Sequence, residues 1–183
     1  RNYQHSSKNT DCMKGTIALA KGAISAGVRR IVGIGTCAEY QESSMPLDIN
    51  SPLSPTTPYA VSKVETFLTL TRLCSASNTA FAWCRLFYVY GDGEYPTRLY
   101  PYLVSKLVAG EKVNLSHGRQ VRDFLDVEEA ARQVVRFALG NKTGPLNICS
   151  GQGITVRRFA EKIADQFGDR EQLVFGERFM NQF

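Results

Sequence analysis

The stretch Pro58-Tyr59-Ala60-Val61-Ser62-Lys63 gives the first clear structural signal in this sequence. Pro58 suits the first position of a helix, where its missing N–H costs nothing, and Thr57 just ahead of it can act as the N-cap. Tyr59 and Lys63 then lie one turn apart on the same face of the helix. The stretch therefore predicts a helix that begins with a tyrosine and a lysine side by side.

A tyrosine and a lysine in this arrangement can act together on a proton. The positive end of a helix and a nearby ammonium group both favour the phenolate form. Lowering the pKa of a tyrosine from about 10 to about 7 takes roughly 4 kcal/mol, and one cation at about 4 Å supplies an amount on that order at an effective dielectric constant near 20. We therefore expect Tyr59 to be a general acid/base whose pKa is lowered mostly by Lys63, with a bound cationic ring supplying the rest. Such pairs also occur by chance on helices that only pack, so the surrounding residues decide between these interpretations.

The composition excludes several classes of protein. The chain has 183 residues, 43% hydrophobic and 21% charged, which is typical of one soluble domain. No apolar run approaches the roughly 18 residues of a membrane span, and the first residues lack the apolar core of a signal peptide. Two distant histidines and an odd number of cysteines without CxxC spacing argue against a metal site and a disulfide framework. We therefore expect a cytoplasmic protein with reduced thiols, at Cys12, Cys37, Cys74, Cys84 and Cys149.

The charge of the chain gives a weaker indication of its partners. The formal net charge is +5, and basic residues occur only as scattered doublets without interleaved aromatic residues. This pattern does not favour nucleic-acid binding. A mild positive balance also suits an anionic small substrate, such as one that carries a diphosphate.

Strand-like and helix-like segments alternate along the chain, which predicts an α/β fold with a largely parallel sheet. In such sheets, ligands bind beyond the carboxyl ends of the strands, and Thr36 and Tyr88 each follow a predicted strand. The predicted helices cover residues 8–27, 58–77, 97–109, 128–139 and 155–167, and the predicted strands cover residues 30–35, 80–87, 112–115, 121–127, 145–149 and 172–175.

Six segments that follow one another along the chain give the sequence its resemblance to a known family. The chain resembles the extended short-chain dehydrogenase/reductase family, in its NAD(P)-dependent sugar-nucleotide epimerase/dehydratase branch. A tyrosine and lysine at this spacing alone would be a weak signal, but six ordered segments across nearly the whole chain are specific. They are Asn9 to Thr16, Ile31 to Tyr40, Tyr59 to Lys63, Arg85 to Gly91, Arg119 to Ala131, and Pro145 to Ile148 followed by Ser150-Gly151.

The resemblance implies a set of catalytic and cofactor-binding residues. Tyr59 matches the catalytic acid/base, and Lys63 matches the lysine that binds the nicotinamide ribose and lowers the tyrosine pKa. Thr36 matches the hydroxyl residue that bonds the substrate oxygen, although an ordinary cap after a strand would look the same. Leu86 and Phe87 would also contact the cofactor, NAD or NADP. The implied chemistry is hydride transfer at a sugar carbon, with Tyr59 handling the hydroxyl proton.

The resemblance also implies a nucleotide-sugar pocket with residues from the carboxyl half of the chain. Some of these residues have simpler explanations. Tyr88 could stack on the ligand or only pack, His117 could be a solvent-facing loop residue, and Arg122 could pair with Asp123 or Asp126 instead of a diphosphate. The expected substrate-binding residues are Tyr88, Arg98, Leu99, Leu115, His117 and Arg122.

The expected fold is a partial Rossmann-like parallel sheet flanked by helices, with a small C-terminal α/β substrate-binding part. The Rossmann part would cover residues 1–95 and 121–144, and the substrate-binding part residues 96–120 and 145–183. The family's glycine-rich loop is missing from this sequence. We therefore expect an N-terminally truncated fragment that is itself inactive and binds its cofactor weakly or not at all.

The resemblance further implies a homodimer that forms through the helices at residues 8–27 and 58–77, and no membrane partner. A cut sheet with exposed apolar faces would also favour self-association.

Several reactions remain open at this point. A 4-epimerase or a 4-keto reductase fits best. Cys37-Ala38 stand where the related dehydratases carry an Asp-Glu pair, and this disfavours a 4,6-dehydratase. Glu39 lies one position too late and would be a weak substitute. A non-catalytic Rossmann-like binding or regulatory module is the alternative outside enzymes.

Overall fold

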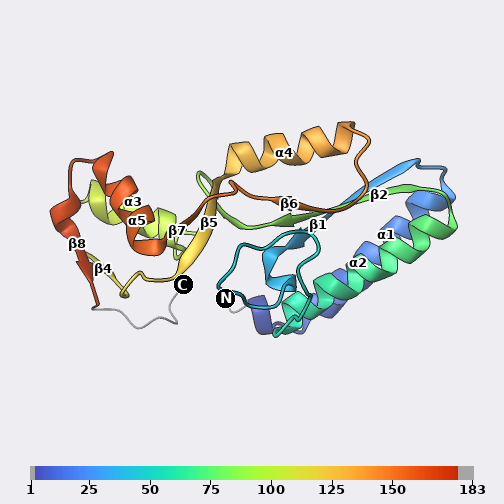
Figure 1. The fold of residues 1–183 in the computed structure, drawn as a ribbon, viewed down its shortest axis with the longest axis horizontal. Helices are drawn as coiled ribbons and strands as arrows, with labels where there is room; N and C mark the ends of the chain where they lie inside the picture. Colours follow the sequence, from blue (N-terminus) through green and yellow to red (C-terminus); the bar gives the residue numbers. More distant parts are fainter. Residues whose placement is uncertain (1–2, 177–183) are drawn as a thin grey trace. The chain divides into compact units, whose positions relative to one another are not determined.

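The computed structural model describes residues 3–176, and its chain divides into two units (Figure 1). The first unit contains Arg1–Phe87 and Ala131–Ile148, and the second contains Tyr88–Ala130 and Cys149–Phe183. Residues 1–2 and 177–183, which belong to the expected parts 1–95 and 145–183, lie outside the described residues.

The first unit is built on three parallel strands in the order β1-β2-β6. These are β1 (Arg30–Thr36), β2 (Ala80–Leu86) and β6 (Gly144–Ile148). Thr36 pairs with Leu86, and Leu86 pairs with Ile148, so the three strands end at the same edge. The central strand β2 is buried along most of its length, as expected for a strand with neighbours on both sides. The parallel sheet predicted from the sequence is therefore confirmed.

Helices cover this sheet on its two sides. α1 (Lys8–Ser25) and α2 (Pro58–Ala76) pack against each other on one side, and Figure 1 shows α4 (Val127–Leu139) on the other. α2 begins as predicted, because Pro58 occupies its first turn and the Thr57 hydroxyl accepts a hydrogen bond from the Ala60 amide at 3.2 Å. Two short 3-10 helices complete this unit, η1 (Tyr3–His5) and η2 (Cys37–Glu39).

The core of the first unit is centred on Trp83, which is 1% exposed. Its ring contacts the rings of Phe67 and Phe81, with centroid distances of 5.8 and 6.1 Å. The indole lies directly against the backbone of β1, where a Cβ at Gly33 would come within 2.4 Å of an indole carbon and one at Gly35 within 2.3 Å of the indole nitrogen. The glycines of β1 therefore make room for this tryptophan.

In its described residues, the second unit has two small sheets, two α-helices and a short 3-10 helix. Its mixed sheet has the order β3-β5-β7, with β3 (Tyr88–Tyr90), β5 (Val121–Asp126) and β7 (Gly153–Thr155), and β4 (Val113–Leu115) pairs with β8 (Leu173–Phe175). α3 (Leu99–Val108), α5 (Val156–Asp165) and the 3-10 helix η3 (Arg170–Gln172) complete it. The buried core comes from both helices and β4.

The boundaries between the units differ from those drawn on the sequence. The chain crosses between them after residues 87, 130 and 148, whereas the sequence placed the boundaries after residues 95, 120 and 144. The expected strand 80–87 ends at Leu86, and β3 pairs with β5 instead of extending β2. The expected strand 121–127 likewise pairs within the second unit. The roles expected for the two parts remain predictions.

Within residues 3–176, no helix combines the length and the hydropathy that crossing a lipid bilayer requires.

The contact between β1 and Trp83 gives a test of the fold. Gly33→Ala should lower the free energy of unfolding by about 1–3 kcal/mol, because an added methyl group overpacks the core. Gly15→Ala in α1 is the matched control, since a Cβ there meets nothing within 4 Å. It should be neutral, or stabilise by about 0.4–1 kcal/mol through the unfolded state. Urea denaturation followed by circular dichroism measures both, and equal effects would contradict the packing described.

Candidate active site

Thr36 is the last residue of β1 and caps the 3-10 helix that follows. Its hydroxyl accepts a hydrogen bond from the Ala38 amide at 3.3 Å, and its own amide donates to the Glu39 carboxylate at 2.8 Å. This reciprocal capping box fixes the backbone of the turn. The simple interpretation of Thr36 as a cap is therefore correct, but its side chain also lies close enough to Tyr59 to act on the pKa of that phenol.

Tyr59 lies in the first turn of α2, next to Thr36. Burial raises the pKa of its phenol, the neighbouring phenol of Tyr3 adds to this rise, and the hydrogen bond with Thr36 acts in the opposite direction. The ring of Tyr3 meets that of Tyr59 edge-on, with centroids 5.1 Å apart. The pKa of Tyr59 in this structure is therefore raised, whereas Lys63 and a bound cationic ring were expected to lower it.

Lys63 is anchored on the neighbouring strand β1. Its Nζ atom donates a hydrogen bond to the carbonyl oxygen of Ile34 in β1, at 2.8 Å, and lies 5.9 Å from the centroid of the Tyr59 ring. Burial lowers the pKa of the Lys63 ammonium, while the negative charge of Glu39 raises it. Lys63 is nevertheless anchored beside Tyr59 at the edge of the sheet.

The two remaining candidates of the first unit, Leu86 and Phe87, lie at the end of β2. Leu86 is the last residue of this strand and is the register partner of Thr36. The amide of Phe87 donates to the carbonyl oxygen of Ile148 at 3.1 Å, and its ring lies 6.5 Å from that of Tyr40. Together with Thr36, these residues line the carboxyl edge of the sheet, where α/β proteins bind their ligands.

Two candidates of the second unit lie together. The guanidinium carbon of Arg122 is 5.1 Å from the centroid of the Tyr88 ring, which fits a cation–π contact. Tyr88 also packs against Phe124 of the same small sheet, at 6.0 Å. Arg122 donates to the carbonyl oxygen of Val121 at 2.8 Å.

The aspartates considered as alternative partners of Arg122 have other donors. The Asp123 carboxylate accepts from the amides of Ser150 and Gly151, at 2.7 and 2.8 Å. Asp126 accepts from the amide of Glu128 at 2.9 Å. These backbone donors hold Asp123 within β5, and they hold Asp126 at the end of β5, just before α4 begins.

The other candidates of the second unit have varied surroundings. Arg98 pairs with Glu94 at 3.2 Å, and Leu99 begins α3 and packs against the core. His117 is exposed, in the loop after β4. Leu115, in contrast, is 1% exposed and belongs to the core. Its side chain packs inside the core, so it could contact a ligand directly only if the core opened.

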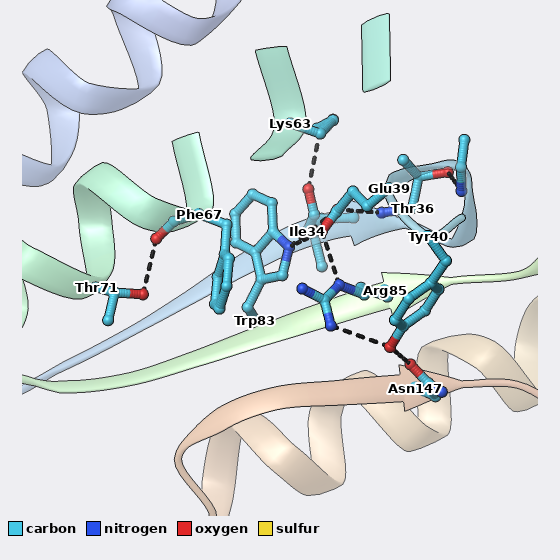
Figure 2. A network of polar contacts seen from close by, with 11 residues as sticks. Ile34, Thr36, Glu39, Tyr40, Lys63, Phe67, Thr71, Trp83, Arg85 and Asn147 are labelled. Carbon is cyan, nitrogen blue, oxygen red and sulfur yellow. Dashed lines mark hydrogen bonds and ion pairs between the residues drawn. The ribbon is translucent and has the colours of Figure 1, made fainter. Parts of the chain in front are cut away.

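A buried polar network that the sequence analysis did not identify lies beneath Thr36 (Figure 2). The Glu39 carboxylate accepts from Arg85 Nε at 2.7 Å and from Trp83 Nε1 at 3.0 Å. Arg85 Nη1 donates to the Tyr40 hydroxyl at 3.0 Å, and this hydroxyl donates to Asn147 Oδ1 at 2.7 Å. One signal was available, because an arginine inside an apolar central strand requires a buried partner.

Glu39 cannot replace the missing acidic pair of the dehydratases in this arrangement. Its side chain is fully buried, and Arg85, Trp83 and the Thr36 amide occupy both of its oxygens. The interpretation of Glu39 as a weak substitute base is therefore wrong. Within residues 3–176, no cluster of three or more His, Cys, Asp or Glu side chains is arranged to hold a metal ion.

The fold and this site define an α/β protein of the Rossmann type with a threonine, a tyrosine and a lysine at the carboxyl edge of its sheet. The chain belongs to the NAD dependent epimerase/dehydratase family, whose model matches residues 4–149. The family expected from the sequence is thereby confirmed.

Three known proteins illustrate the range of relatives. The chain is 26% identical to a dTDP-6-deoxy-L-talose 4-dehydrogenase (NAD(+)) of Aggregatibacter actinomycetemcomitans, covering 74% of this chain and 51% of that protein. It is 30% identical to a UDP-glucose 4-epimerase of Streptomyces lividans, covering 81% and 51%. A DesIV double mutant (dTDP-glucose 4,6-dehydratase) from Streptomyces venezuelae, solved with NAD and DAU bound, superposes with a TM-score of 0.76 at 26% identity, over 88% of this chain and 51% of that one. The chain thus spans about half the length of the curated relatives it matches.

The raised pKa of Tyr59 gives a second prediction. A spectrophotometric titration at 295 nm counts phenolates as pH rises, so the difference between the wild-type protein and Tyr59→Phe isolates this residue. The absorbance change that Tyr59→Phe lacks relative to the wild type should have its midpoint above the ordinary tyrosine pKa of about 10. The reason is that burial disfavours the charged phenolate. A transition below that value would instead restore the lowered pKa first expected. Circular dichroism of both proteins controls for unfolding.

Proposed function

We propose that this chain is part of an NAD(P)-dependent enzyme that transfers a hydride at a carbon of a nucleotide-linked sugar, with Tyr59 as the acid/base. The observation that carries this proposal is the placement of the half-buried Tyr59 phenol beside Thr36 at the end of β1, with Lys63 anchored to Ile34 next to them. Two hydroxyls and an ammonium at the carboxyl edge of a parallel sheet can share one substrate oxygen and one ribose.

The residues fit a nicotinamide cofactor, since Lys63 and Tyr59 present an ammonium and a hydroxyl on one helix face, as a ribose diol requires. NAD or NADP, when bound, supplies the hydride donor or acceptor. In the reductive direction, Tyr59 gives its proton to the sugar carbonyl oxygen as the carbon gains the hydride. In the oxidative direction, the hydroxyl proton passes to the phenolate of Tyr59 as the carbon loses the hydride. Thr36 holds the reacting oxygen in both directions.

Among reactions of this kind, we favour 4-epimerisation or reduction of a 4-keto sugar. Water elimination by a 4,6-dehydratase is the alternative, because a relative of this kind shares the fold. Against it, Cys37-Ala38 begin η2 in place of an acidic pair, and Glu39 is buried. A non-catalytic binding module would not need Thr36, Tyr59 and Lys63 together.

The nucleotide-sugar contacts of the second unit remain part of the proposal. The Tyr88–Arg122 pair offers a cation and an aromatic face, which suit a diphosphate and a ring respectively. Arg98, Leu99, Leu115 and His117 complete the expected set, with Leu115 acting through the core.

The first test is the loss of the phenol hydroxyl. In the full-length protein, Tyr59→Phe should lower kcat for a dTDP- or UDP-linked sugar by about 10²- to 10⁴-fold, the range of general acid–base catalysis. Cofactor reduction or oxidation followed at 340 nm, or product analysis by NMR for an epimerase, measures turnover. Tyr95→Phe is the control, because Tyr95 is 64% exposed on a loop of the second unit. Unchanged turnover in Tyr59→Phe would overturn the assignment.

We also propose a homodimer formed through α1 and α2. Both helices expose large apolar side chains, with Leu19 at 75% and Leu68 at 40% exposure. Such side chains are typical of an interface core when they gather on packed helices.

A charge placed on this surface should therefore break the dimer. Leu19→Glu should shift sedimentation velocity from a dimer to a monomer, whereas Leu139→Glu, on α4 and 84% exposed, should not. A wild-type monomer, or a shift caused equally by both variants, would contradict the proposed interface.

A further inference from the structure

The Glu39 carboxylate is tied to the backbone of the proposed catalytic threonine. Its Oε1 atom accepts from the Thr36 amide at 2.8 Å and from Trp83 Nε1 at 3.0 Å, and its Oε2 atom accepts from Arg85 Nε at 2.7 Å. The side chain is 0% exposed. Because three donors from two neighbouring strands hold this carboxylate, the position of the Thr36 amide is set by the interior of the sheet.

The space for this arrangement is built into β1. A Cβ at Gly35 would lie 2.4 Å from Glu39 Oε1 and 2.3 Å from Trp83 Nε1. The residue before Thr36 is therefore a glycine because the carboxylate and the indole approach its backbone so closely. Any larger residue there would push Glu39 away from the Thr36 amide.

Arg85 connects the carboxylate to the rest of the sheet (Figure 2). Its guanidinium lies between the rings of Tyr40 and Phe67, with centroid distances of 4.7 and 5.0 Å. It donates to the Tyr40 hydroxyl, which donates to Asn147 of β6. The network thus spans β1, β2 and β6, and it leaves Glu39 little freedom to move.

Stability alone is a poor reason for this ion pair. Burying a charged pair costs several kcal/mol per ion in desolvation, and apolar residues of similar volume are often as stabilising or more so. Glu39 also acts on the site electrostatically. Its negative charge raises the pKa of both Tyr59 and Lys63, which favours a protonated phenol and a charged ammonium. Both protonation states are the ones that the proposed proton donor and ribose-binding residue need.

We propose that Glu39 is a positioning residue for the proposed reaction: held by Arg85 and Trp83, it fixes the Thr36 main chain so that the Thr36 hydroxyl meets Tyr59. This inference rests on the proposed function of Thr36 and Tyr59 and extends it to a residue that touches neither substrate nor cofactor.

The test removes the ion pair without leaving a buried charge. The double variant Glu39→Met/Arg85→Met replaces both groups by apolar side chains in the full-length protein. Its kcat should fall by about 10- to 100-fold, the range expected when a reacting group shifts by a fraction of an ångström to an ångström. Cofactor affinity should stay within about threefold, because Lys63 keeps its anchor on Ile34.

A matched variant separates the effect of the hydrogen-bond acceptor at position 39 from the effect of its negative charge. Glu39→Gln/Arg85→Met is equally uncharged, but its amide oxygen can still accept from the Thr36 amide. It should recover most of the lost kcat. A kcat as low as that of the double methionine variant would overturn the role of the acceptor.

A double-mutant cycle with Thr36→Val identifies the route of the effect. If Glu39 acts through the Thr36 hydroxyl, the double methionine change should lower kcat by no more than about twofold in the Thr36→Val background. A merely structural role would cost the same factor in both backgrounds, and that result would overturn the proposal.

Hydrogen exchange makes the proposal testable without turnover. The Thr36 amide should exchange at least tenfold more slowly in the wild type than in the double methionine variant, as NMR of the ligand-free protein would show. Equal exchange rates would overturn the positioning role. A wild-type protein with a protected Thr36 amide but no turnover of any nucleotide sugar would instead overturn the proposed function.

Discussion

The ion pair between Arg85 and Glu39 is the constraint on which the active edge of the first unit depends. Arg85 lies in the central strand with neighbours on both sides, so its guanidinium has no route to solvent. An unpaired charge there would be prohibitive, and the partner must come from a residue that can reach back into the sheet. Glu39 does so only because η2 turns sharply after Thr36. The geometry of the turn, and with it the orientation of Thr36, follows from the need to neutralise a buried arginine.

Local patterns in the sequence were sufficient for much of the first unit. The start of α2, the pairing of Tyr59 with Lys63 on one face, and the two strands that end at Thr36 and Leu86 follow from capping and apolar runs. The network around Glu39 does not follow from such patterns, because its members are distant in sequence and meet only when three strands are aligned. The strand predicted at residues 80–87 ends at Leu86 in the structure, and a separate strand, β3, begins at Tyr88. No local pattern in the sequence marks this break between the two strands.

In the second unit, local sequence patterns also left one set of contacts unresolved, namely the partners of Arg122. The sequence placed Arg122 near two aspartates and left their pairing open, because adjacent charges on a strand point to opposite faces. In the structure, backbone amides of the loop at Ser150 and of the start of α4 bind those carboxylates. Arg122 lies over Tyr88 instead. Short acidic side chains at element ends are used more readily by nearby backbone donors than by a neighbouring side chain.

The pKa of Tyr59 was the clearest failure of reasoning from sequence, and it bears on the direction of the reaction. An estimate from one lysine at close range omitted burial, which disfavours the phenolate, and Lys63 donates its hydrogen bond to the carbonyl oxygen of Ile34. In the reaction proposed above, a phenol that keeps its proton is ready to donate it, so a reductive step would begin from the state that prevails at neutral pH. The oxidative step must first remove that proton, and burial adds to its cost. In the proposed reaction, burial of Tyr59 thus favours its role as a proton donor over its role as a proton acceptor.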